Sequence, residues 1–285
     1  MATKIINPAV PNLPNAPDAY LRQYQDQYSN VLRLYFNQLK NALGDLFNTQ
    51  GGKYLSFPGG AFHQDGSTTL SSGITNVSTT PISVADTSAF PSSGWILIGN
   101  EIISYTTKTA TTFDGTVTRG VLGTTNVAHS AGAAITEVQG TGSPTTIGTV
   151  LFNNTDYSNG VSTSADYSQL NFNVSGVYNL QFSAQLLNFT TSEDNVTMWF
   201  RQNGVDIPAS ASIEQVNSKH GSSPGARIMT VNLFATINSG DYIQLAWSSD
   251  TGNTVVATAP AGTSPVHPVS PALIFTAQFV SALPT

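Results

Sequence analysis

The spacing of hydrophobic residues changes near residue 54, and this change separates a predicted helix from predicted strands. Between residues 18 and 50, apolar side chains recur every three or four residues and proline is absent. This spacing places them on one face of an α-helix, so we predict a helix over residues 18–50. The apolar face includes Tyr28, Leu32, Tyr35, Leu39 and Leu46.

Two roles are open for this helix. In the first, its apolar face packs against the protein's own domain. In the second, it packs against the same helix of other copies and forms a short parallel bundle. A proline-rich segment precedes the helix and Gly51–Gly52 follow it, so it is set apart from the rest of the chain. We therefore favour the bundle, and we interpret residues 1–17 as an extended anchor arm.

After residue 80 the apolar residues alternate with polar ones between turn-forming dipeptides, which is typical of antiparallel strands. Residues 81–138 are predicted to form a small antiparallel β-module, and residues 150–285 a β-sandwich or jelly roll of about eight strands. Residues 51–80 are predicted to be a linker with one or two short strands, and residues 139–149 a flexible joint. The longest predicted strands are 177–189, 196–202, 227–237, 241–247 and 273–280.

Composition removes several classes of protein. The 285 residues contain no cysteine, which excludes disulfides, thiolate metal sites and cysteine nucleophiles. Charged residues are 9% and hydrophobic residues 40%, so the chain can build a core beneath a largely uncharged polar surface. No apolar run is long enough to span a bilayer or to act as a leader, so we expect neither membrane insertion nor classical export.

The charge is distributed unevenly along the chain. Residues 1–53 hold five Lys/Arg against three Asp/Glu (+2), and residues 54–285 hold five against thirteen (−8), which sums to the formal −6. The basic residues of the longer part are scattered, whereas a nucleic-acid groove needs them clustered. We therefore expect no nucleic-acid partner.

Four segments in the last part of the chain carry a family resemblance. Over roughly residues 150–280, they resemble, in order, the jelly-roll heads of the complement and tumour-necrosis-factor type, particularly those at the ends of bacteriophage virion proteins. The resemblance implies a homotrimer around a threefold axis. It also makes Tyr178, Phe182, Trp247 and Phe275 candidates for the core or for the trimer interface. The four segments are 175–184 (SGVYNLQFSA), 199–208 (WFRQNGVDIP), 240–247 (GDYIQLAW) and 271–274 (PALI).

In such heads Gly176 would permit a tight turn before a strand, and Asn203–Gly204 would form a hairpin turn. The middle unit resembles a small β-module of tailed-phage structural proteins. The first 50 residues resemble, more loosely, the anchor ends of marine phage fibre proteins, which dock on the particle. The segments that carry the resemblance of the module are 90–94, 99–105, 118–121 and 129–133.

Candidate chemistry is sparse. The four histidines lack the spacing of metal ligands, and the segment 156–166 lacks the D-x-D-x-D-G spacing of a calcium loop. A G-x-S-x-G elbow needs a strand-to-helix turn, which has no place to form because we expect essentially no helix after residue 50, and no Gly-rich stretch is followed by a helix that could bind phosphate. We expect no catalytic residue, no metal and no cofactor. The carboxylates from which a glycan-cleaving pair could be drawn are Glu101, Glu137, Glu193, Asp194, Glu214 and Asp241.

Aromatic residues in predicted loops are the better candidates for ligand contact. Tyr157, Tyr167, Phe189 and the polar loop 209–225 combine aromatic faces with amides and hydroxyls, which is typical of saccharide sites. A plain polar surface would have the same composition, so both interpretations stay open.

These observations predict a homotrimeric, non-enzymatic virion protein on the particle surface, synthesised in the host cytoplasm. Residues 1–50 would contact other virion proteins, the small β-module would act as a spacer, and the outward head would adhere to a host-envelope glycan or protein through avidity. One alternative is a capsid decoration or neck component that stabilises the particle. A glycan depolymerase is the less favoured alternative.

Overall fold

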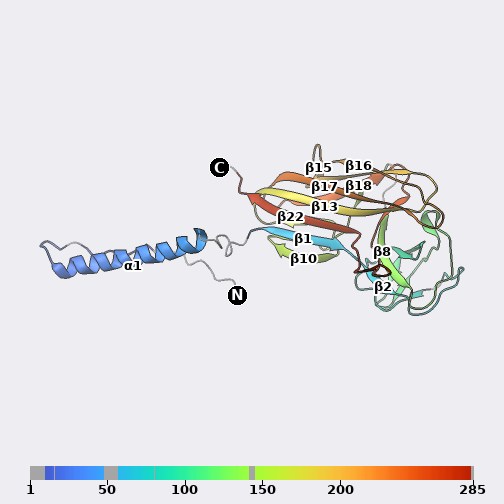
Figure 1. Ribbon diagram of the computed structural model, residues 1–285, viewed down its shortest axis with the longest axis horizontal. Helices are drawn as coiled ribbons and strands as arrows, with labels where there is room; N and C mark the ends of the chain where they lie inside the picture. The colour runs from blue at the N-terminus through green and yellow to red at the C-terminus, as the bar shows by residue number, and fades with distance from the viewer. Residues whose placement is uncertain (1–9, 16, 48–56, 80, 141–144, 284–285) are drawn as a thin grey trace. The chain divides into compact units, whose positions relative to one another are not determined.

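The computed structural model describes residues 10–15, 17–47, 57–79, 81–140 and 145–283. They belong to two units, one that ends at Phe57 and one that begins at Pro58. The first contains one helix, and the second is built of antiparallel strands with a single short 3-10 turn (Figure 1). The prediction of a mainly β protein with one N-terminal helix and a β-sandwich is therefore confirmed.

The helix α1 (Arg22–Phe47) covers most of the predicted range. It begins four residues later than predicted, because the first helical carbonyl to accept a hydrogen bond is that of Leu21, from the backbone N–H of Gln25 at 3.3 Å. Residues 48–50 of the prediction and the side chain of Leu46 lie outside the described part of the chain. The other four residues of the predicted stripe, each half-buried, are Tyr28, Leu32, Tyr35 and Leu39.

The described part of the unit that contains α1 has no core of its own. Among the side chains described between residues 10 and 44, none is buried, and Leu34 and Phe36 are 54% and 58% exposed. The Tyr24 hydroxyl donates to the Pro14 carbonyl at 3.3 Å, which ties residues 10–15 of the predicted arm to the helix. No helix in the described part of the chain combines the length and the apolar character needed to cross a membrane.

The second unit contains a jelly roll made of two packed sheets. The jelly roll has eight main strands, which we number one to eight in the order in which they occur along the chain. Strands one, eight, three and six lie side by side in one sheet, and strands two, seven, four and five lie side by side in the other. The first sheet consists of β10 (Asn154–Asn159), β1 (Gly59–Gln64), β22 (Leu273–Ser281), β13 (Gly176–Asn188) and β17 (Gly225–Ile237). The second consists of β11 (Val161–Thr163), β12 (Leu170–Phe172), β18 (Tyr242–Ser249), β14 (Asp194–Gln202) and β16 (Ser212–Val216), with short β9 (Gly148–Thr149) and β15 (Val205–Asp206) at its margins.

The predicted middle module is an insertion into the jelly roll. It follows the first strand, β1, and precedes the rest of the head, so the head is made of two separate stretches of sequence. A short strand, β19 (Thr254–Ala257), pairs with both β13 and β8 and joins the sheets of the two parts. The module contains β2 (Ser67–Thr69), β3 (Ile82–Ser83), β4 (Gly94–Ile98), β5 (Glu101–Tyr105), β6 (Thr107–Lys108), β7 (Thr112–Asp114), η1 (Val121–Gly123) and β8 (Ala134–Gly140).

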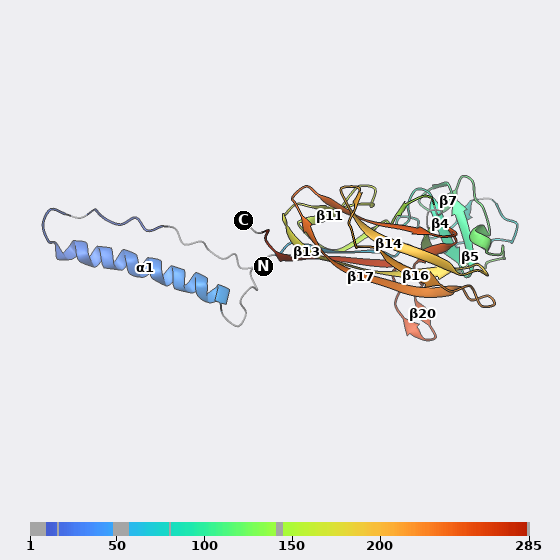
Figure 2. The same cartoon turned by 90° about the horizontal axis from the view of Figure 1, so that it is seen from above.

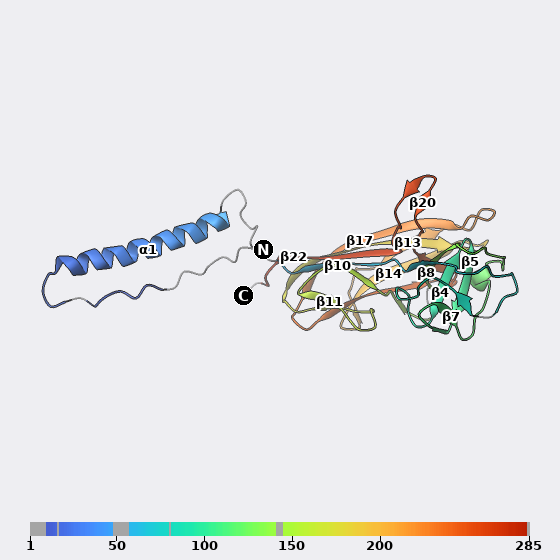
Figure 3. The same cartoon turned by 90° about the horizontal axis from the view of Figure 1, so that it is seen from below.

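This insertion places the module at one end of the unit. The Phe279 N–H donates to the Pro58 carbonyl at the start of β1, whereas the Ala272 N–H donates to the Gln64 carbonyl at its end. The chain therefore enters the unit beside the end of β22 and reaches the module at the opposite end of the unit (Figure 1). The long strand β13, which runs between these two ends, is about 40 Å long. A hairpin of β20 (Gly262–Thr263) and β21 (Val266–His267) projects from the side (Figures 2 and 3).

The main core lies between the two sheets of the jelly roll. Tyr178, Phe182, Trp247 and Phe275 are all at most 1% exposed and belong to this core within one chain. Of the two roles left open for them, core and trimer interface, they take the core, because the facing sheet of the same chain covers them. The module has its own apolar cluster around Phe113.

Two sequence expectations need correction. Residues 51–80 contain two short strands, as predicted, but these strands are not part of a linker, because β1 is the first strand of the jelly roll and β2 pairs with the module strand β8; residues 51–56 and 80 lie outside the described part. Gly176 does not make a tight turn but begins β13, and a Cβ there would lie 2.3 Å from the Phe279 ring. The hairpin turn at Asn203–Gly204 is confirmed, with φ of 53° and 77°.

The predicted joint 139–149 is partly strand, since β8 extends to Gly140 and β9 begins at Gly148. Residues 141–144 lie outside the described part.

We expect residues 58–285 to fold without the helix, and residues 150–285 to fail to fold alone. The shorter fragment loses β1, whose Phe62 is fully buried in the main core, and it exposes the edge of β22 that β1 covers. Thermal unfolding followed by circular dichroism would show one cooperative transition for 58–285 and none for 150–285. A cooperative transition in the shorter fragment would contradict the two-part head.

Candidate functional site

A cavity in the β-unit lies between the module and two loops of the jelly roll, at the end of the unit away from Pro58. It has a volume of about 570 Å³, which is within the usual range of ligand sites. From the module it is lined by Gly99, Asn100, Thr124, Thr125, Val127 and His129, and from the jelly roll by Phe189, Lys219, Gly221 and Ser222.

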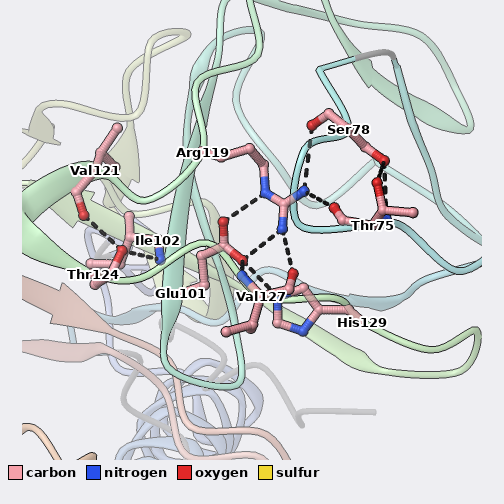
Figure 4. Close-up of polar contacts among 9 residues, drawn as sticks. All are labelled: Thr75, Ser78, Glu101, Ile102, Arg119, Val121, Thr124, Val127 and His129. Carbon is pink, nitrogen blue, oxygen red and sulfur yellow. Dashed lines mark hydrogen bonds and ion pairs between the residues drawn. The ribbon is translucent and has the colours of Figure 1, made fainter.

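A buried ion pair fixes the module side of this cavity. Glu101, at the start of β5, is fully buried, and its carboxylate receives the Arg119 guanidinium at 2.6 and 2.7 Å (Figure 4). One carboxylate oxygen also accepts from the Val127 N–H at 3.1 Å and lies 2.8 Å from Nε2 of His129. The two fork-like bonds are the strongest geometry available to an Arg–carboxylate pair.

The same arginine holds two further loops. Its remaining N–H groups donate to the carbonyls of Thr75 at 2.7 Å and Val127 at 2.6 Å (Figure 4). Thr124 adds a separate tie, because its hydroxyl accepts from the Ile102 N–H at 3.1 Å and donates to the Val121 carbonyl at 2.8 Å. The loop that carries Thr124, Val127 and His129 to the cavity is thus pinned at several points.

Glu101 is ionised at neutral pH. Burial alone would raise the pKa of this carboxyl, but the hydrogen bonds from Arg119, Val127 and His129 outweigh burial and hold its pKa below the usual value. Since an ionised carboxylate can only accept, Nε2 of His129 must carry the hydrogen in their contact. The carboxylate of Glu101 therefore has a structural role and is not free to act as an acid or base.

The jelly-roll side of the cavity is built by the segments after β13 and β16. The Lys219 backbone N–H donates to the Thr190 carbonyl at 2.8 Å, which joins these two segments. Across the cavity, the Asn100 amide of the module donates to the Ser222 carbonyl at 2.6 Å. The cavity is thus bridged at its rim and shaped before any ligand enters.

A second buried carboxyl, Glu137 on β8, lines a smaller cavity of about 380 Å³ beside Trp95. Its burial raises its pKa to about 7; the hydrogen bond from Asn153 at 2.8 Å opposes this only in part, and the nearby Asp65 adds to it. A pKa near 7 is typical of acid–base catalysts. However, among the described residues that line this cavity, no second carboxylate stands opposite Glu137, as glycoside cleavage requires.

The ligand-facing residues predicted from sequence do not share one site. Tyr157 on β10 and Tyr167 after β11 are 51% and 46% exposed, on a part of the jelly roll away from the module (Figure 3). Phe189 is only 3% exposed, so its assignment as an exposed aromatic is wrong: the module covers it, and it packs in a cluster with Leu97 and Val255. It nevertheless contributes to the wall of the cavity.

Sequence reasoning missed the cavity because its two sides come from distant segments. The loop 209–225 was singled out as polar, and Lys219 belongs to it. Glu101, Arg119 and His129 lie in three of the four segments that carry the resemblance of the module to phage structural proteins, and the structure joins them into one network. Among the described residues, no three His, Asp or Glu side chains are grouped so that they could hold a metal ion.

Comparison with known proteins adds no relative. No model of a protein family matches the chain, and no curated protein matches it in sequence. The function must therefore be argued from the geometry.

Proposed function

We propose that the protein is a structural, non-enzymatic component of a tailed-bacteriophage virion. It assembles as a homotrimeric appendage on the particle surface, docks on other virion proteins through residues 1–50, and attaches to the host envelope through its β-unit. The observation that carries the proposal is α1: a 26-residue helix with an apolar stripe and, among the described side chains of its unit, no buried residue. Such a helix gains most of its stability from packing against partners.

The arrangement of the β-unit supports an attachment role, although the module lies at a different place in the unit from the one expected. The chain enters at the end of the unit opposite the module, so the module and the adjoining cavity lie farthest from that point along the unit. The module thus does not space the jelly roll but caps it, and the end of the unit that carries the cavity is the one suited to contact a host surface.

We expect the pair of substitutions Leu32→Asp and Leu39→Asp to dissociate the trimer. Each places a charge on the half-buried stripe, where it would have to be desolvated against neighbouring helices. Light scattering would show the mass falling from three chains to one, and retention on host cells should drop at least about 100-fold through lost avidity.

The matched control is Gln38→Asp, which adds a charge at an exposed position of the same helix and should leave both mass and retention unchanged. A trimer that survives the paired substitutions would contradict assembly through α1. If the wild-type trimer fails to bind host cells, while particles without it lose stability, the protein is a capsid decoration or neck component instead.

A further inference from the structure

The β-unit is poor in basic residues, and Lys219 differs from the others. Arg119 pairs with Glu101, Arg201 with Asp206 at 2.9 Å and Arg227 with Glu214 at 3.4 Å. The ammonium group of Lys108 donates to the backbone carbonyls of Thr87 and Phe90. Within the described part of residues 58–285, Lys219 is the one cationic side chain to which no anionic or carbonyl partner is assigned, and it lines the large cavity.

The described lining of the cavity includes a lysine and no acidic residue, in a unit that is otherwise acidic. No Asp or Glu is among the described residues that line it, although residues 54–285 carry a formal charge of −8, from five Lys/Arg and thirteen Asp/Glu. Glu101 lies behind the lining with its charge satisfied by Arg119. An anionic group that entered the cavity would therefore meet Lys219 without facing an unpaired carboxylate.

The rest of the lining suits a sugar ring. Hydroxyl groups come from Thr125 and Ser222, and apolar surface comes from Val127, which is 43% exposed. Sugars present hydroxyls at their edges and C–H groups on their faces, so they need both kinds of contact, whereas a small inorganic ion needs neither the apolar wall nor about 570 Å³.

We infer that this cavity binds an acidic saccharide unit whose carboxylate is held by Lys219 and whose ring lies against Val127. The inference rests on the proposed attachment function and names its ligand class. His129 stands beside the site with its Nε2 turned to Glu101, which orients the imidazole and leaves Nδ1 for a ligand hydroxyl.

The test is ligand-observed saturation-transfer NMR on the full chain with three probes: glucuronic acid, glucose, which has the same ring without the carboxylate, and acetate, which has the carboxylate without the ring. We expect the Kd for glucuronic acid to be at least about 10-fold lower than for glucose or acetate. Lys219→Gln should raise it to the value for glucose. Lys40→Gln, which removes an exposed lysine of α1, should leave it unchanged.

Equal affinity for glucuronic acid and glucose would overturn the role of Lys219, and equal affinity for acetate would reduce the cavity to a simple anion site. No saturation of glucuronic acid by the wild-type protein would overturn the inference altogether. The proposed function has a separate readout: a protein that attaches to host cells but binds no glucuronic acid keeps the function and loses the inference, whereas a protein that attaches to no cells loses the function.

Discussion

Replacing Arg119 with methionine should lower the free energy of unfolding of the β-unit by about 3–5 kcal/mol, the cost of leaving one partner of a buried ion pair without the other. Glu101 would then be a fully buried carboxylate that keeps only the bonds from Val127 and His129. Thr75 would also lose the donor that holds its carbonyl. Urea unfolding of the wild-type and variant proteins at pH 7 measures the difference.

Two companion variants separate charge burial from loss of packing. In the double variant Glu101→Gln and Arg119→Met no charge is buried, so it should recover much of the lost stability. Arg227→Met breaks the ion pair with Glu214, in which both side chains are more than one-third exposed, and should cost no more than about 1 kcal/mol. An equal loss in Arg119→Met and Arg227→Met would refute the structural role of the buried pair.

Replacing Glu137 with glutamine should make the β-unit more stable relative to wild type as pH rises. Burial raises the pKa of Glu137 from 4.5 to about 7, so the folded protein keeps a proton that the unfolded chain has already released between these values. The free energy of unfolding of the wild type therefore falls as pH rises through this window and levels off above it. At 1.36 kcal/mol per pKa unit, the loss is about 3 kcal/mol.

Glutamine has the same shape and can still accept from Asn153, but it has no proton to lose. The stability difference between Glu137→Gln and wild type should therefore grow by about 3 kcal/mol between pH 4.5 and pH 8. Glu193→Gln alters a solvent-exposed carboxyl and serves as the control, with no comparable growth. A pH-independent difference for Glu137→Gln would show that this carboxyl is not held protonated by its surroundings.

The long strands could be predicted from sequence because both their faces and their ends are encoded locally. The run predicted at 177–189 corresponds to β13 (Gly176–Asn188), and that predicted at 227–237 lies within β17 (Gly225–Ile237). Both strands alternate strongly, since one face packs in the core, and both end at turn residues. The helix was found for the same reason, at a period of three to four residues.

The insertion of the module could not be predicted because it depends on a pairing that sequence does not encode locally. Strand β1 contains two glycines and one large buried apolar residue, Phe62, and its neighbour β22 lies near the end of the chain. A short strand with so little alternation resembles a linker until its partner is known. Phe189 was misjudged for a related reason: the module that covers it is built by residues far earlier in the chain.

The cavity could not be predicted from the sequence for the same two reasons. Lys219 and His129 were each visible in the sequence as isolated polar residues, and only the packing of the module against the jelly roll brings them to one site. The pairing of Arg119 with Glu101, by contrast, could have been sought in the sequence. A buried Arg or Glu needs a partner of opposite charge, and this unit has few charged residues to choose from.

Light scattering at micromolar concentration measures the mass of the full chain in solution and so decides whether three copies assemble. The helix α1 has no buried side chain in its described part, and assembly of three copies would cover its apolar stripe. We expect a particle of three times the 30.0 kDa of one chain. A stable particle of 30.0 kDa would contradict this assembly.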